Sequence, residues 1–564
     1  MVTRSGADRR VEPELPGQGG SIAPRVFWPA LIVIVAVVAF AVIAPGTADS
    51  VIKAVQESII GTFGWYYTLI VTGFVVFALW VGFGHFGDIK LGPDDEEPEF
   101  GVWSWFAMLF AAGMGIGLVF YGVAEPLNHF ASPKPGVSGT PTELAQQSMV
   151  QTFLHWGLHP WAIYVVVGLA IAYAVHRKNR PVSIRWALEP LLGKRVNGWL
   201  GDLVDIAAIV GTLFGVATSL GLGVTQIAAG LDFLDIVQDP GNWTKILLIG
   251  GITTMAVISV VSGVKKGIKW LSNINLSLAV VLLLFVLVAG PTVFVFREFV
   301  QSVGLYFQQL VRLSFDTTAL QGEQGTTWQG SWATFYWGWW ISWSPFVGVF
   351  IARISRGRTV RQFVAGVLAV PATVTFLWFT VFGGTALWRQ LFGEGGLVGE
   401  DGSVDTEGAL FGLLDKLPGG PLVVGAAILL IVLFFVTSSD SGSLVVDMLA
   451  SGGNPEPPTW SRVLWASLEG IAAIALLLAG GLGALQTTAI VIALPFSVVM
   501  LAMCVSTWKA FHAERTLMVR IQRRLQRDEF TEHVSRSLIE DGLVDEPEPA
   551  GSGTRQANDT PRGS

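Results

Sequence analysis

The feature that most constrains this chain is a series of apolar runs, each long enough to cross a lipid bilayer. A hydrocarbon core about 30 Å thick requires about 20 apolar residues per helix. The runs lie near residues 26–46, 64–86, 103–127, 149–175, 199–230, 244–263, 270–296, 331–353, 363–389, 421–450, 460–479 and 485–511. We therefore expect an all-α membrane protein with twelve transmembrane helices, referred to as spans 1 to 12. The first run is too long for a signal peptide and lacks a small-residue cleavage site.

The composition agrees with a membrane protein and excludes several other classes. Of the 564 residues 52% are hydrophobic and 14% are charged, whereas soluble domains carry about 25% charged residues. The net charge is −7, and the basic residues lie in short loops, so we expect no nucleic-acid partner. The single cysteine, Cys504, excludes a disulfide framework and a cysteine-ligated metal site.

Basic residues also predict the orientation of the chain. They cluster in the loops after spans 4, 6 and 8, at 177–195, 265–269 and 353–361, while the intervening loops carry few. Because loops rich in Lys and Arg stay in the cytoplasm, both termini are expected to be cytoplasmic. The expected location is the cell inner (plasma) membrane.

The chain is expected to divide into regions where its composition changes. Two of these regions hold five spans each, and because five is an odd number, the two units would lie upside down relative to each other in the membrane. Residues 509–540 have two interpretations: a basic flank touching anionic lipid, or a regulatory helix that senses the membrane surface. Short amphipathic helices are expected at 298–312 and 407–416. The expected regions are a disordered N-terminus at 1–25, two peripheral spans and a linker at 26–102, a five-helix unit at 103–297, an outer amphipathic helix and loop at 298–330, a second five-helix unit at 331–512, and a basic helix with a disordered tail at 513–564.

Span 3 contains a glycine-rich stretch, 111–117, with the sequence AAGMGIG. Glycine weakens helices, and unwound backbone in a membrane is tolerated only where it lines protein or a watery site. The stretch can therefore unwind and offer carbonyl oxygens to a cation. Close helix packing through Gly113 and Gly117 is the alternative, and for the similar pair Gly211 and Gly215 packing is favoured.

Span 10 contains a polar stretch, 434–443, with the sequence FFVTSSDSGS. We expect a second interruption here, with hydroxyl and carbonyl oxygens of the kind that sodium prefers. The alternative is helix-to-helix hydrogen bonding with Ser and Thr bonded back to the preceding turn. Asp440 is favoured as a structural carboxylate over a direct transport role. Two broken spans at matching places indicate an inverted-repeat secondary transporter.

Two spans carry aromatic side chains on one face. At 100° per residue, three tryptophans of span 8 share a face, and three aromatic residues of span 4 fall within about 140° of arc. Indole faces bind a quaternary ammonium with about 0.5–2 kcal/mol per contact. An interfacial aromatic belt is the alternative, but the span 8 tryptophans lie well inside the span. These residues are Trp156, Trp161 and Tyr164 in span 4, and Trp339, Trp340 and Trp343 in span 8.

His155 and His159 lie four residues apart, a spacing that suits a metal, but no third ligand accompanies them in the sequence. We favour buried structural histidines.

Two of these regions carry a family resemblance. The sequence GMGIG at 113–117, continuing into FYGVAEP at 120–126, and the sequence FYWGWWISWSPF at 335–346 resemble the betaine/carnitine/choline transporter family. The resemblance covers about residues 26–512. It implies twelve spans in a core of two inverted five-helix repeats (spans 3–7 and 8–12), a homotrimer, and uptake of trimethylammonium compounds or similar solutes. It implies no enzyme activity and no cofactor, with sodium as the coupling ion.

By position, the resemblance also implies which residues bind the solute and the ions. Val216 stands where another threonine is expected, so the second sodium site departs from the family pattern. The implied solute site is Gly115, Gly117, Trp156, Trp161, Tyr164, Trp339, Trp340 and Trp343. The implied first sodium site is Ala111 and Met114 through their carbonyls, with Phe434, Thr437 and Ser438, and the implied second site is Thr212 and Phe346.

The charge of the solute follows from Gly117. Choline-moving members of the family often carry an acidic residue there, and a buried cation without a counter-charge is costly. A zwitterion brings its own carboxylate, which predicts sodium-coupled uptake of glycine betaine or a related compatible solute for osmoprotection. A choline or carnitine carrier of the same family, and sodium-coupled uptake of ectoine or proline, stay open.

Two further alternatives lie outside this solute class. A sodium symporter for neutral amino acids would need no aromatic cage, and a channel or osmotic release valve would need no occluded site. A membrane enzyme is disfavoured, because the sequence shows no nucleophile–base pair, metal triad or paired carboxylates at mid-membrane depth.

Overall fold

The computed structural model describes residues 22–113, 115–262 and 265–541. In these ranges the regular elements are helices, and the only extended pairing is one antiparallel bridge between Lys90 and Thr359. The all-α class expected from the sequence is confirmed. Residues 1–21 and 545–564, which were expected to be disordered, lie outside the described ranges. The chain forms two compact units, residues 1–509 and 510–564.

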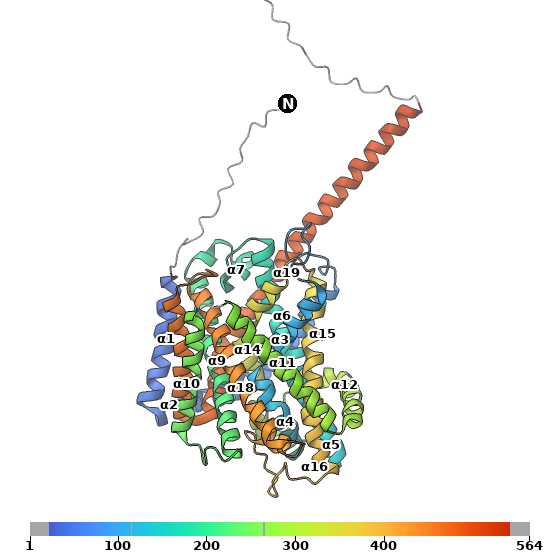
Figure 1. Ribbon diagram of the computed structural model, residues 1–564. Coiled ribbons are helices and arrows are strands. Elements are labelled where there is room, and N and C mark those ends of the chain that lie inside the picture. Colours follow the sequence, from blue (N-terminus) through green and yellow to red (C-terminus); the bar gives the residue numbers. More distant parts are fainter. Residues whose placement is uncertain (1–21, 114, 263–264, 542–564) are drawn as a thin grey trace, which may run out of the picture. The chain divides into compact units, whose positions relative to one another are not determined.

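The first unit consists of packed helices, several of them interrupted (Figure 1). In chain order the elements are α1 (Pro24–Ile43), α2 (Pro45–Phe83), α3 (Val102–Gly113), α4 (Ile116–Ala131), α5 (Pro141–Trp156), α6 (Leu158–Ala172), η1 (Tyr173–Arg177), α7 (Ile184–Ala187), α8 (Glu189–Leu192), η2 (Gly193–Asn197), α9 (Trp199–Phe233), α10 (Asn242–Ser262), α11 (Lys265–Ala289), α12 (Thr292–Ser314), α13 (Gly322–Gln329), η3 (Gly330–Thr334), α14 (Phe335–Ile354), α15 (Val360–Phe379), η4 (Thr380–Gly384), α16 (Thr385–Phe392), α17 (Ala409–Asp415), α18 (Gly420–Ala450) and α19 (Thr459–Glu540).

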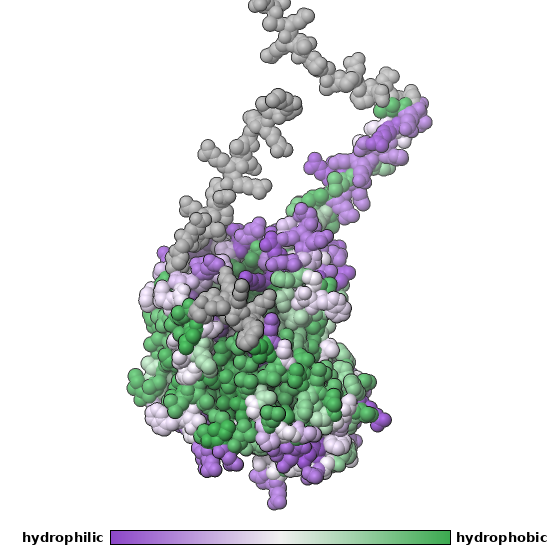
Figure 2. Space-filling view, in the orientation of Figure 1, coloured by the Kyte–Doolittle hydropathy of each residue, from purple (hydrophilic) through white to green (hydrophobic). Residues whose placement is uncertain are grey.

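Most of the long helices are apolar enough to cross a membrane. Among the described residues nine helices meet this condition, and the bent pair α3–α4 would make a tenth. α14 is not among them, because its tryptophans and serines lower its mean hydropathy below that of the others. Figure 2 shows the matching surface on the first unit, a broad hydrophobic band between two hydrophilic ends. This band is the surface that lipid chains cover.

Several helix boundaries differ from the expected spans. α2 begins at Pro45, directly after α1, and runs for 39 residues, so it starts well before the apolar run near 64–86. The boundary expected between spans 11 and 12 is confirmed within α19, where Gly480 and Gly481 interrupt the helix. Gly481 has φ 65°, a left-handed conformation that glycine adopts without steric cost. The amphipathic segment 298–312 lies within α12, and α17 covers 409–415 of the segment 407–416, so helices are present in both places as expected.

Span 4 is broken, which the sequence analysis did not predict. α5 ends at Trp156, and Gly157 (φ −93°, ψ −127°) separates it from α6. A Cβ at position 157 would lie 2.5 Å from the carbonyl oxygen of Phe153 and 2.7 Å from Cζ of Phe376. Only glycine fits this break without displacing its neighbours.

The core of the first unit lies where the broken helices meet. α14 packs against α6 and α9, α18 packs against α9, and α4 packs against α5. Two of the basic loops, 177–195 and 353–361, meet the segment after α2 at one end of this core: the Arg177 guanidinium donates to the Gly92 carbonyl, and the Leu91 amide donates to the Arg358 carbonyl. The start of α1 lies at the same end, because the Ala23 amide donates to the carbonyl of Ala450. This arrangement matches the side that the positive charges assign to the cytoplasm.

Candidate functional site

Helices α4, α6, α9, α14 and α15, with the end of α5, enclose a cavity in the core. The cavity brings together every residue of the implied solute site, and no charged side chain is among its described lining residues. The implied residues that line it are Gly115, Gly117, Trp156, Trp161, Tyr164, Trp339, Trp340 and Trp343. Ser219 and Thr375 add two hydroxyl groups to the lining.

The aromatic rings form walls that stand at steep angles to each other. Trp339 and Trp340 stack with centroids 4.7 Å apart, and Trp156 meets Trp340 edge to face at 4.9 Å. Tyr164 stands at 79° to Trp340, with centroids 6.4 Å apart, and at 76° to Trp161. Rings set at such angles present several π faces to one enclosed group, as a cation–π cage requires.

The polar edges of these tryptophans are bonded to protein. Trp339 donates its indole N–H to the Ser219 hydroxyl at 3.2 Å, and Trp343 donates to the Gly215 carbonyl at 2.8 Å. Trp340 donates to the His155 carbonyl at 3.0 Å. With the N–H groups bonded in this way, the ring faces are left as the surfaces that can contact a solute.

The burial of the tryptophans separates a cage from an aromatic belt. Trp339 and Trp340 are 2% and 8% exposed. Belt residues place their polar edges at the membrane–water interface, whereas these two rings lie inside the protein. The belt interpretation is therefore wrong for the α14 tryptophans.

The break expected in span 3 is present beside this cavity. α3 ends at Gly113 and α4 begins at Ile116, with a bend of 67° between them and Gly115 in an extended conformation. Gly117 approaches the cage so closely that a Cβ there would lie 2.3 Å from Cη2 of Trp339 and 3.1 Å from Cη2 of Trp156. The glycine stretch thus both unwinds and admits close packing.

The break expected in span 10 is absent, and that prediction is wrong. α18 is a continuous helix through residues 434–443. The Thr437 hydroxyl donates to the Leu433 carbonyl at 2.9 Å, and the Ser443 hydroxyl donates to the Asp440 carbonyl at 3.1 Å. Because the hydroxyls find partners within the helix or on neighbouring helices, the polar stretch is buried without unwinding. Asp440 pairs with Arg462 at 2.9 Å, which agrees with a structural role.

Most of the implied first sodium set lines a second cavity next to the cage. This cavity is lined by Ala111, Phe434, Thr437 and Ser438, together with Trp343 of the cage. Met114 lies outside the described residues. The Thr437 hydroxyl also accepts a hydrogen bond from the Asn275 side chain at 3.3 Å. Residues of α3 and α18 are thus close to one wall of the solute cavity.

The structure does not bring the implied second sodium set together in one cavity. Phe346 lines the same cavity as the first set, whereas Thr212 is not among its lining residues. Thr212 is fully buried, and its hydroxyl has no hydrogen-bond partner among the described residues. Val216 lies one turn further along α9 and packs closely against Gly442 of α18. A Cβ added at Gly442 would lie 2.8 Å from a methyl carbon of Val216. The expected packing of Gly215 is confirmed, since a Cβ there would lie 2.9 Å from the Trp343 ring.

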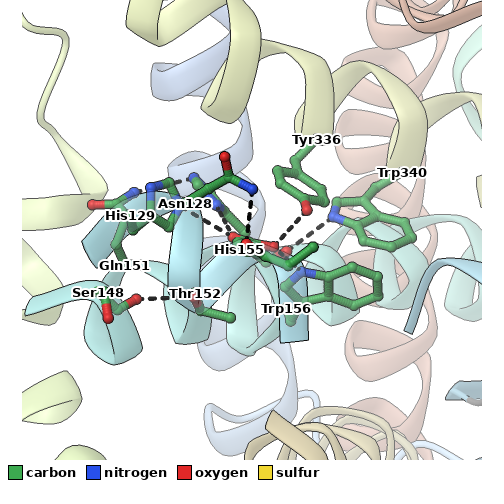
Figure 3. Close-up of polar contacts among 11 residues, drawn as sticks. Asn128, His129, Ser148, Gln151, Thr152, His155, Trp156, Tyr336 and Trp340 are labelled. Atoms are coloured by element: carbon green, nitrogen blue, oxygen red, sulfur yellow. Dashed lines mark hydrogen bonds and ion pairs between the residues drawn. The ribbon is translucent and has the colours of Figure 1, made fainter. Parts of the chain in front are cut away.

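The sequence analysis missed a buried polar cluster behind the cage, centred on Glu125. Figure 3 shows Trp156, Tyr336 and His155 close together, with His129 nearby. The first three each form a hydrogen bond with the Glu125 carboxylate. The sequence does indicate this cluster, because Glu125 belongs to the FYGVAEP motif and a carboxylate inside an apolar span is a functional candidate by default. His129 follows Glu125 by one helical turn.

Glu125, His129 and His155 offer three potential metal ligands within 4.8 Å. The separation of 2.6 Å between Glu125 Oε1 and His155 Nδ1 is that of a hydrogen bond. Two ligands bound to one tetrahedral zinc at about 2.0–2.1 Å lie further apart. His159 is bonded instead to the Ser314 hydroxyl at 3.0 Å. The histidines are therefore structural in this conformation, as expected.

Comparison with known proteins agrees with the geometry of the site. Residues 25–516 match the model of the betaine/carnitine/choline family transporters. The chain belongs to this family. Its members are transporters, so the chain is a membrane transporter and not an enzyme.

Three relatives illustrate the range within the family. An uncharacterised transporter of Mycobacterium tuberculosis is 54% identical over 498 residues, covering 87% of this chain and 83% of the relative. The glycine betaine transporter OpuD of Bacillus subtilis is 46% identical, covering 87% of this chain and 94% of its own length. The high-affinity choline transport protein of Escherichia coli is 42% identical, covering 80% and 67%.

Proposed function

We propose that this transporter imports glycine betaine or a related compatible solute, coupled to sodium, and that it serves osmoprotection. The observation that carries the proposal is the cavity itself, in which aromatic faces surround a space whose described lining holds no charged side chain. A trimethylammonium group has no N–H to donate, so π faces suit it better than carbonyl oxygens do.

The uncharged lining favours a zwitterion over a simple cation. A buried cation without a counter-charge is costly, whereas glycine betaine carries its own carboxylate. The hydroxyls of Ser219 and Thr375 line the same cavity. In this structure they donate to backbone carbonyls, and after rotating away from these they could donate to the carboxylate. The similarity to the glycine betaine transporter OpuD supports this solute. The similarity to a choline transport protein supports the alternative, a choline or carnitine carrier.

Sodium is the proposed coupling ion because residues of α3 and α18, among them Thr437 and Ser438 with their hydroxyl groups, line a cavity that shares Trp343 with the cage. One ion there would connect the bent α3–α4 pair to α18. We assign this first site to Ala111, Met114, Phe434, Thr437 and Ser438. A second ion at Thr212 and Phe346 has weaker support, because the two residues do not line one cavity.

We further propose twelve spans with both termini cytoplasmic in the cell inner (plasma) membrane, and a homotrimer as the family resemblance implies. α14 and a second crossing within α19, after Gly481, complete the ten candidate spans. Inverted repeats of spans 3–7 and 8–12 are supported by packing: α9 contacts α18 and α3 contacts α14, and each pair holds the same place in its repeat.

Counterflow in proteoliposomes tests this function. The purified transporter is loaded with unlabelled betaine and offered labelled betaine, choline, carnitine, ectoine or proline, with sodium or with potassium in its place. We expect betaine to exchange fastest and its uptake to fall at least about ten-fold without sodium. Faster exchange of choline, or betaine uptake that ignores sodium, would refute the proposal. Preference for proline would favour the neutral amino-acid symporter, and non-saturable flux would favour a channel.

A further inference from the structure

A buried carboxylate lies directly behind one wall of the cage. Glu125 of α4 is fully buried. Its Oε2 accepts hydrogen bonds from the Trp156 indole N–H at 2.7 Å and from the Tyr336 hydroxyl at 2.5 Å. Its Oε1 lies 2.6 Å from His155 Nδ1 and 3.3 Å from His129 Nε2 (Figure 3). Because an indole N–H can only donate, the oxygen facing Trp156 must be an acceptor.

The described residues give Glu125 no lysine or arginine partner. Its ion-pair neighbours are His129 and His155, which carry charge only when protonated. The ammonium of Lys134, further along the same chain segment, is paired with Asp316 at 2.6 Å. Tyr336 faces the carboxylate as a hydroxyl donor. When both histidines are neutral, the cluster holds one negative charge, that of Glu125, inside the membrane-embedded core.

The cluster is joined to two walls of the cage. Trp156 lines the solute cavity with its ring and donates its N–H to Glu125 on the other side. Trp340, which meets Trp156 edge to face, is bonded through its N–H to the carbonyl of His155. A carboxylate bonded to the edge of an indole makes the potential over its faces more negative, and that potential is what attracts a cation to the ring.

We propose that Glu125 is a specificity-determining residue that supplies, through Trp156, a fixed negative charge for the cationic end of the solute. The inference rests on the proposed function. Glu125 is not among the described lining residues of the cavity, so it acts across the indole and makes no direct salt bridge. Its field attracts the whole charge of choline, whereas the two ends of betaine feel opposite forces that partly cancel. It also orients a zwitterion with its carboxylate away from Trp156.

The test is Glu125→Gln, which keeps the shape of the side chain and its ability to accept from Trp156 but removes the charge. Competition of unlabelled choline and betaine against labelled betaine gives both apparent affinities in proteoliposomes. We expect choline affinity to fall about ten-fold and betaine affinity about three-fold or less. Thr152→Val is the matched control, because Thr152 is a buried residue of α5, the helix that carries Trp156, and its hydroxyl donates to the carbonyl of Ser148; we expect it to leave both affinities unchanged.

Equal losses for the two solutes would show a merely structural role and overturn the inference, as would no change in either. If the wild-type protein takes up neither solute, the proposed function fails and the inference fails with it. Trp156→Phe provides a second test that keeps an aromatic ring, a smaller one, and the charge but removes their hydrogen bond. We expect it to lower choline affinity more than betaine affinity, and to reduce the effect of Glu125→Gln in the double variant. Full additivity of the two changes would contradict action through Trp156.

Discussion

Two stretches, residues 111–117 and residues 434–443, contain residues that are unusual in an apolar transmembrane helix. Both stretches were expected to unwind, but their backbones differ in the structure. The first breaks between α3 and α4, whereas the second stays helical within α18. The first is built from glycines, which have no side chain to replace a lost backbone partner and which leave the backbone free to turn. The second is built from hydroxyl residues, which bond to the preceding turn and stabilise the buried helix from within.

The two stretches could supply different oxygen ligands to an ion, namely backbone carbonyls or side-chain hydroxyls. An unwound glycine segment exposes backbone carbonyls, whereas an intact helix can offer the side-chain hydroxyl of Thr437 or Ser438. Both segments contribute residues to the cavity that adjoins the cage. A change in the glycine segment should therefore affect the shape of the solute site, and a change in α18 should affect the ion.

The largest expected effect follows from Gly117→Ala. The new Cβ would lie 2.3 Å from the Trp339 ring, and overpacking of this kind costs about 1–3 kcal/mol. We expect the affinity for betaine to fall about 10- to 100-fold, measured as the KM of uptake. Gly73→Ala is the control, since a Cβ there meets no atom within 4 Å. Unchanged affinity in Gly117→Ala would show that the segment does not shape the solute site.

Thr437→Val should have a smaller effect, and on the ion. The substitution keeps the volume and the helix but removes the hydroxyl, whose hydrogen bond is worth about 0.5–1.5 kcal/mol. We expect the sodium concentration for half-maximal uptake to rise about three- to ten-fold, with the maximal rate less affected. Thr373→Val, which removes a similarly back-bonded hydroxyl on α15, should leave sodium dependence unchanged. An altered maximal rate with unaltered sodium dependence would place Thr437 outside the ion site.

Asp440→Asn should have the smallest effect on transport. Asp440 bonds to Arg462 at 2.9 Å, and both side chains are largely buried, so loss of the carboxylate charge should lower thermal stability by about 1–3 kcal/mol. We expect less than about a two-fold change in sodium dependence, because the pair stabilises α18 against α19. Thermal unfolding in detergent and sodium titration of uptake measure the two effects. A shift in sodium dependence as large as that of Thr437→Val would assign Asp440 a direct transport role.

Prediction from the sequence succeeded where one local property decides the outcome. The periodic tryptophans of α14 and the mid-span glycines of α3 need no knowledge of other helices. No equally local feature indicates the break at Gly157, because that glycine is required by Phe376 on α15. For the same reason the arc calculated for Trp156, Trp161 and Tyr164 on one helix is wrong, since the break separates Trp156 from the other two.

The cluster behind the cage was missed for a related reason. Glu125 and Tyr336 lie 211 positions apart in the chain and meet only after α4 and α14 pack. The unexpected continuity of α18 likewise depends on neighbours, because the Ser439 hydroxyl bonds to Glu469 on α19. Residue types indicate which chemistry is available, whereas the packing of distant helices decides which groups satisfy each other.

The claim on which the account depends is that the α14 tryptophans hold the quaternary ammonium group. The most direct measurement is labelled-betaine uptake by the double variant Trp340→Leu and Trp343→Leu, compared with Trp243→Leu, whose side chain is 78% exposed. Two lost cation–π contacts of about 0.5–2 kcal/mol each should raise the KM at least about five-fold, while the control keeps the wild-type value. Uptake by the double variant at the original KM would contradict the account.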